Sequence, residues 1–161
     1  MSASGFTLRE ARREDVPAIA GLIEDLALYE RQPEDCHADP RLLEEHLFGP
    51  KPFAEVILAE AGGEVIGFAL FFHNYSTWLT RPGLYLEDLY VRPERRGLGA
   101  GKALLVELAR IAVARGCGRM EWSVLTWNEP AIGFYRALGA VSMDGWRTYR
   151  LAGDALRALG R

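Results

Sequence analysis

A glycine-rich turn flanked by cations is the segment of this chain best suited to bind an anion. Gly97, Gly99 and Gly101 occupy every second position of the stretch between an apolar segment and a run with helical periodicity. Because glycine accepts positive φ and lets the backbone approach a ligand, successive N–H groups and the positive end of the helix can face phosphate oxygens. Arg96 and Lys102 add positive charge at the same place. The sequence therefore predicts a phosphate-binding turn.

Two better known phosphate motifs do not fit this turn. A P-loop needs glycine at position 96 and serine or threonine at position 103, where the chain has Arg96 and Ala103. The dinucleotide fingerprint fails because its third glycine would fall on Lys102 and no second mononucleotide-binding half follows. A glycine-rich connector with solvated arginines is the structural alternative.

The elements that must position the turn are a strand over Leu84 to Val91 and a helix from Gly101 to Gly116. Apolar residues recur along this helix at intervals of three and four, which predicts one buried stripe. Ahead of them, the patterns predict a short strand, two helices and an antiparallel hairpin. Their expected places are Phe6 to Leu8, Asp15 to Tyr29 with Asp15 as cap, Leu42 to Gly49, and Glu55 to Glu60 followed by Val65 to Phe72.

The last third of the chain predicts a strand, a helix and two closing strands. Met120 to Thr126 alternates as a strand, and Asn128 is placed to cap a helix that ends just before Gly139. Val141 and Gly145 to Leu151 are expected to close the sheet. The order of elements predicts an α/β fold with a mixed central sheet, antiparallel N-terminal strands, a βαβ core and flanking helices. We expect one domain over residues 1–161.

Composition indicates a globular protein, since 49% of the 161 residues are apolar and 25% are charged. The longest apolar run near a turn, Val65 to Phe72, is far shorter than the roughly 20 residues of a membrane helix. The first fifteen residues lack the apolar run of a secretion signal, which predicts a cytoplasmic protein. Cys36 and Cys117 are too few for a disulfide framework, and the three histidines lack metal-ligand spacing.

Charge is distributed unevenly within the net charge of −3: the first 60 residues have an excess of acids and the others an excess of bases. This distribution suits a cationic substrate on the first part and an anionic ligand on the second, and solvated faces are the alternative explanation. The chain has no basic stripe with interleaved aromatics, which argues against a nucleic-acid partner.

Arg96, Gly99 and Gly101 in RGLGAG resemble the Q/R-x-x-G-x-G/A pyrophosphate motif of the GNAT acetyltransferases. The resemblance implies the GNAT fold, acetyl-CoA as co-substrate and no metal. The residues that it implies for binding acetyl-CoA are Leu89, Tyr90, Val91, Arg96, Gly97, Leu98, Gly99, Ala100, Gly101, Lys102, Asn128 and Tyr135.

Further segments are similar to the spermidine/spermine (diamine) acetyltransferase branch of that family. They are YLEDLYV at 85–91, TWNEPAIGFYRALGA at 126–140 and GWRTYRL at 145–151, with a weaker match in LALYE at 26–30. This combination is more selective than the glycine motif alone.

Acyl transfer from a thioester to an amine needs a proton acceptor, because an alkylammonium with a pKa near 10.4 must lose a proton before it attacks. Glu87 is the expected acceptor, since it lies in the strand beside the turn, and regular alternation places it on the face opposite Asp88. A solvated carboxylate is the alternative. The backbone N–H of Leu89 is the expected donor to the oxyanion. Tyr135 matches the family's general acid, which would protonate the departing thiolate, and a packing role on its helix is the alternative.

The resemblance implies a substrate site of carboxylates and aromatics, which suits a small cationic amine. We therefore expect acetyl transfer to a primary amine of a polyamine or diamine. Thialysine or another lysine-like amino acid is the alternative substrate, and a non-catalytic acyl-CoA-binding sensor is the alternative outside the enzymes. The resemblance also implies a homodimer. The implied substrate residues are Tyr29, Glu30, Glu87, Glu121, Trp122, Ser123 and Asp144.

Overall fold

The computed structural model describes residues 5–161 and divides into two compact units, one reaching to Ser123 and one over Val124–Arg161. The single domain expected over residues 1–161 stays a prediction, and residues 1–4 of that range lie outside the described residues.

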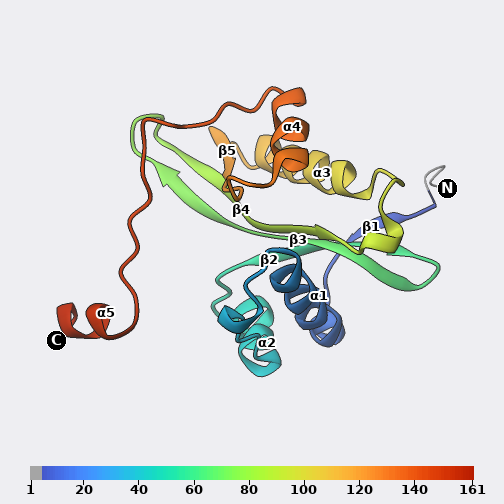
Figure 1. Ribbon diagram of the computed structural model, residues 1–161, viewed down its shortest axis with the longest axis horizontal. Helices are drawn as coiled ribbons and strands as arrows, with labels where there is room; N and C mark the ends of the chain where they lie inside the picture. Colours follow the sequence, from blue (N-terminus) through green and yellow to red (C-terminus); the bar gives the residue numbers. More distant parts are fainter. Residues whose placement is uncertain (1–4) are drawn as a thin grey trace. The chain divides into compact units, whose positions relative to one another are not determined.

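A five-stranded mixed sheet forms the centre of the first unit (Figure 1). Neighbours from β1 to β4 are antiparallel, and β5 runs parallel to β4. Gly62 and Gly63 at the β2–β3 hairpin have φ of 58° and 79°, in the region that glycine enters without a steric penalty. The predicted mixed sheet with antiparallel N-terminal strands is confirmed. In spatial order, the strands are β1 (Thr7–Glu10), β2 (Glu55–Ala61), β3 (Glu64–Ser76), β4 (Arg81–Val91) and β5 (Arg119–Trp122).

Helices cover both faces of the sheet: α1 (Val16–Tyr29) and α2 (Pro40–Phe48) lie on one face and α3 (Ala100–Ala114) on the other (Figure 1). α3 connects the parallel strands β4 and β5, which need such a crossover. None of the helices within residues 5–161 is long and apolar enough to cross a membrane. The buried core between the sheet and α1 and α2 is formed by Ile19, Leu22, Leu26, Leu47, Val56, Leu58, Phe68 and Tyr90.

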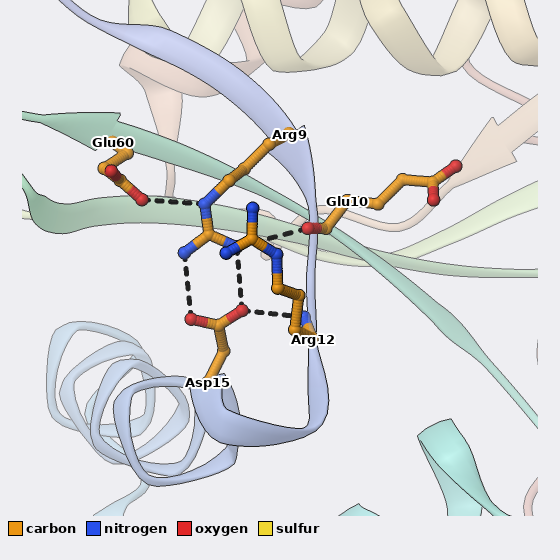
Figure 2. A network of polar contacts seen from close by, with 5 residues as sticks. All are labelled: Arg9, Glu10, Arg12, Asp15 and Glu60. Atoms are coloured by element: carbon orange, nitrogen blue, oxygen red, sulfur yellow. Dashed lines mark hydrogen bonds and ion pairs between the residues drawn. The ribbon is translucent and has the colours of Figure 1, made fainter.

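A network of polar contacts ties β1 to β2 and to the start of α1 (Figure 2). Arg9 donates to the Glu60 carboxylate at 2.7 Å and to both oxygens of Asp15 at 2.8 and 2.9 Å. The hydrogen bonds from Arg9 lower the pKa of Asp15. Asp15 also accepts from the backbone N–H of Arg12 at 2.7 Å. Asp15 is the N-cap residue of α1, as predicted, but its side chain makes no capping hydrogen bond to α1, because these donors occupy its carboxylate.

The second unit contains α4 (Glu129–Ala137) and α5 (Gly153–Leu159), and residues 124–161 contain no strand. The predicted closing strands at Val141 and Gly145 to Leu151 are therefore wrong, and α5 is absent from the sequence prediction. Alternating apolar residues form a strand only where a neighbouring strand satisfies their backbone groups. For the same reason β5 stops at Trp122, four residues short of the predicted end, since its pairing with β4 stops there.

Candidate active site

The glycine-rich turn connects the end of β4 at Val91 to the start of α3 at Ala100. Gly97 and Gly99 have φ of 90° and 85°, and Gly99 is the N-cap of α3. At both glycines, nothing lies within 4 Å of the place that a Cβ would take, so the backbone conformation, rather than lack of space, requires glycine. Gly101 differs from the predicted positive φ because it lies in the first turn of α3.

The start of α3 presents backbone donors to a ligand. The first N–H groups of an α-helix have no acceptor within the helix, and Gly99 has no side chain to cap them. The backbone of Ala103 is the first to bond back, to the Gly99 carbonyl at 3.0 Å. The N–H groups of Ala100 to Lys102, the helix dipole and the exposed Lys102 side chain therefore suit a diphosphate.

Arg96 begins the glycine-rich turn, and its side chain points toward α1 and β4. Its Nε donates to the Val91 carbonyl oxygen at 3.0 Å. Its guanidinium carbon lies 5.0 Å from the ring centre of Tyr29 and 5.6 Å from that of Tyr90. The turn is thus in contact with the last residue of α1.

A β-bulge in β4 changes which face of the sheet its side chains occupy. Leu70 of β3 lies opposite Asp88, whereas the next residue, Phe71, lies opposite Leu86, so Glu87 is an extra residue in the ladder. Because Leu70 and Phe71 point to opposite faces, so do Asp88 and Leu86. Leu70 packs against the core under α1, which places Asp88 on the α1 face. The regular alternation expected through Glu87 is therefore wrong.

Glu30, Glu87 and Asp88 lie within electrostatic range of one another and are called the acid cluster below. Burial, then the charges of Glu87 and Glu30, raise the pKa of Asp88 to about 7. Burial and the charge of Glu87 also raise the pKa of Glu30. The structure thus brings together two predicted substrate residues, and it adds Asp88, which sequence reasoning missed. The adjacent acids in YLED are the only sequence signal that could have found it.

Asp88→Asn is expected to stabilise the protein at pH 8 by roughly 1–2 kcal/mol and to change little at pH 4. The pKa of Asp88 is about 7 in the folded state against 3.8 ordinarily, so the native state holds its proton longer than the unfolded state. Wild-type stability therefore falls as pH rises from about 4 to 7, and the variant lacks this loss. Urea unfolding at both pH values measures the effect. An equal change at the two values would contradict it.

Three further predicted substrate residues lie where β5 leaves β4. Pairing of the two strands stops at Leu86 and Trp122, just before the bulge. Ser123 follows, and its Oγ lies 3.1 Å from the Tyr85 hydroxyl. The Glu121 carboxylate pairs with Arg119 at 3.2 Å. Beyond this point β4 continues to Val91, with Leu89 opposite Ala69 of β3.

The other predicted site residues belong to the second unit. Asn128 caps α4 as predicted, since its Oδ1 accepts from the backbone N–H of Ala131 at 3.4 Å. Tyr135 lies in α4, half-buried, with its ring centre 5.6 Å from that of Phe134. Asp144 is exposed in the segment after α4 and accepts a hydrogen bond from Ser142. Within residues 5–161, no group of His, Cys, Asp and Glu side chains is arranged to hold a metal ion.

Residues 19–140 match the model of the acetyltransferase (GNAT) family. The chain belongs to that family. It is 38% identical to thialysine N-epsilon-acetyltransferase of Bos taurus, over 94% of this chain and 95% of the relative. It is 32% identical to spermidine/spermine N(1)-acetyltransferase-like protein 1 of Homo sapiens, over 94% of this chain and 23% of the relative. An integron cassette protein from V. cholerae has the same fold, with a TM-score of 0.82, 25% identity and 98% of each chain covered.

This GNAT protein is therefore an acetyl-CoA-dependent acyltransferase that acts on an amine, and not the non-catalytic sensor that the sequence left open. The predicted GNAT fold is confirmed. The glycine turn fits the coenzyme, because two left-handed glycines without side chains lead into the open end of a 15-residue helix. Acetyl-CoA supplies a thioester, and the acyl group leaves its sulfur during transfer.

Proposed function

We propose that this protein acetylates a primary amine of a small polyamine or diamine by direct transfer from acetyl-CoA. The acid cluster supports this proposal most strongly. Three carboxylates lie within electrostatic range of one another where α1 ends against β4, and burial together with repulsion between their charges raises the pKa of Asp88 and Glu30. A substrate with two or more ammonium groups relieves this repulsion, because each ammonium can pair with a carboxylate.

The coenzyme is assigned to the turn and the first turn of α3, where Gly97 to Lys102 offer backbone N–H groups to the diphosphate. Leu89 to Val91 at the end of β4 are assigned to the pantetheine arm, together with Asn128. The β4 backbone is suited to this role because β5 pairs with β4 only as far as Leu86. The Leu89 N–H is the proposed donor to the oxyanion that forms on the acetyl carbonyl.

Two side chains are assigned to proton transfer. Glu87 accepts the proton that the ammonium loses before attack, and Tyr135 donates a proton to the departing thiolate. The position of Glu87 at the bulge supports its assignment, because the extra residue sets its side chain apart from the regular ladder. Tyr29, Glu30, Glu121, Trp122, Ser123 and Asp144 are the proposed contacts for the rest of the amine.

A lysine-like amino acid is the second candidate substrate. One relative that matches over nearly the full length of both chains is a thialysine N-epsilon-acetyltransferase. Thialysine has two ammonium groups, as a diamine has, and also a carboxylate. That carboxylate would lie near the acid cluster unless a cation received it, so the cluster favours the diamine.

A panel of amines tests the proposal, with release of free CoA thiol as the measurement. Putrescine-like diamines, polyamines, thialysine and lysine are compared at equal concentration, with and without the Glu87→Gln substitution. We expect the highest kcat/KM on a diamine or polyamine and a large loss in the variant. Preference for thialysine would select the second candidate. Activity on peptides alone would contradict both candidates.

We also propose that the protein is a cytoplasmic homodimer. Large apolar side chains after α4 are exposed in the single chain, among them Val141, Trp146, Tyr149 and Leu159. A second copy would remove such surface from water, which favours association. We expect light scattering to give about twice the chain mass of 17.9 kDa. A mass equal to one chain at assay concentration would contradict the dimer.

A further inference from the structure

Arg96 bridges the glycine turn and the end of α1. Both ring contacts of its guanidinium, on Tyr29 and on Tyr90, are within the roughly 6 Å at which a cation and an aromatic face attract each other. The two rings lie 6.5 Å apart and are tilted by 51°. Since Nε is bonded to the Val91 carbonyl, the plane of the guanidinium is fixed from the strand side as well.

A second arginine of the same turn contacts α1 one helical turn earlier. Arg92 Nη1 lies 3.3 Å from an Asp25 oxygen, and its Nε donates to the Val65 carbonyl at 3.3 Å. Asp25 and Tyr29 are four residues apart and therefore lie on one face of α1. The turn is thus attached to the C-terminal end of α1 at two points, and Glu30 of the acid cluster follows directly.

We propose that Arg96 is a positioning residue for the amine site. Its contact with Tyr29 fixes the end of α1 and thereby the Glu30 carboxylate, a role separate from the charge that Arg96 adds to the diphosphate turn. The inference rests on the proposed function, because it takes Glu30 as a contact for the amine. It follows that amine recognition depends on the flat, fixed shape of the Arg96 guanidinium, whereas the contribution of Arg96 to coenzyme binding depends on its positive charge.

Arg96→Lys separates the two roles, since lysine keeps the charge but has neither the planar fork nor its stacking surface. We expect the KM for the amine to rise about three- to thirtyfold, which corresponds to the strength of such contacts. The Kd of CoA, measured by calorimetry without amine, is expected to change less than about threefold. Thermal unfolding establishes that the variant is folded.

Tyr29→Leu and Tyr29→Phe test the contact from its other side. In the Tyr29→Leu background, Arg96→Lys is expected to cause no further rise in the amine KM, because the contact is already lost. In the Tyr29→Phe background, which keeps the ring, Arg96→Lys is expected to cause its full effect. This double-mutant comparison distinguishes positioning from two independent contacts with the substrate, whose effects would multiply.

Arg115→Lys is the matched control. It also removes an arginine from an aromatic face, that of Phe71 at 5.8 Å, together with a two-point ion pair to Glu55. Arg115 follows the C-terminal end of α3, whereas Arg96 precedes its start. We expect the amine KM of this variant to stay within about twofold of wild type.

Where the wild type is active, two outcomes would overturn the positioning role and leave the proposed function intact. One is an amine KM of Arg96→Lys equal to that of wild type, and the other is that the effects of Arg96→Lys and Tyr29→Leu multiply. A rise in the Kd of CoA with no change in amine KM would assign Arg96 to the coenzyme only. A wild type that acetylates no amine in the panel would instead overturn the proposed function, and the inference with it.

Discussion

Tyr135→Phe is expected to lower kcat by roughly ten- to a thousandfold, while the Kd of CoA stays within about twofold of wild type. The substitution removes only the hydroxyl, so the ring still packs beside Phe134 in α4. Without that hydroxyl, the thiolate must leave without a proton or take one from water. Steady-state kinetics with a saturating amine, together with calorimetry on CoA, measure the two quantities.

The control for this prediction is Tyr149→Phe, which removes a hydroxyl from an exposed tyrosine of the same unit. We expect its kcat to match that of wild type. Full activity of Tyr135→Phe would contradict the assignment of the general acid. A loss of CoA affinity without a loss of kcat would move Tyr135 from catalysis to coenzyme binding.

Gly99→Ala is expected to raise the KM for acetyl-CoA about tenfold or more. Gly99 has φ of 85°, and an L-residue in the left-handed region costs roughly 1–2 kcal/mol. The helix start relieves this strain by rotating away from the observed conformation, which turns the N–H groups of Ala100 to Lys102 away from the diphosphate. Initial rates at varied acetyl-CoA measure the KM, and calorimetry with CoA measures binding directly.

Gly21→Ala is the matched substitution. Gly21 lies within α1, has a helical φ, and nothing lies within 4 Å of the place of its Cβ. Alanine is favoured over glycine inside a helix by roughly 0.5–1 kcal/mol, so we expect higher stability and an unchanged KM. If Gly99→Ala left the KM for acetyl-CoA at the wild-type value, the turn would not be the diphosphate site.

Local signals in the sequence predict the elements that surround the turn. The three- and four-residue spacing in α3, the apolar run of β4 and the alternating glycines each depend on residues close together in the chain. The cap of α4 by Asn128 is also a local feature, and the structure has it as predicted. The family resemblance itself depends on these same segments.

The features that the sequence could not predict depend on partners far away in the chain. The bulge at Glu87 arises from the pairing of β4 with β3, and only this pairing brings Asp88 to the α1 face. The contact of Arg96 with Tyr29 likewise needs α1 to lie against the turn. The strand predicted over residues 145 to 151 is wrong for a related reason: their alternation suits a strand, but no neighbouring strand is paired with them.

Because of the bulge, the residue at position 87 can also be changed without disturbing the pairing of the strands around it. Leu86 and Asp88 already face consecutive residues of β3, Phe71 and Leu70. A chain with residue 87 deleted could therefore form the same ladder without a mismatch, and Leu86 and Asp88 would keep their places on opposite faces of the sheet. Chemistry at this point can thus be altered by deleting or exchanging a single amino acid, with no redesign of the scaffold.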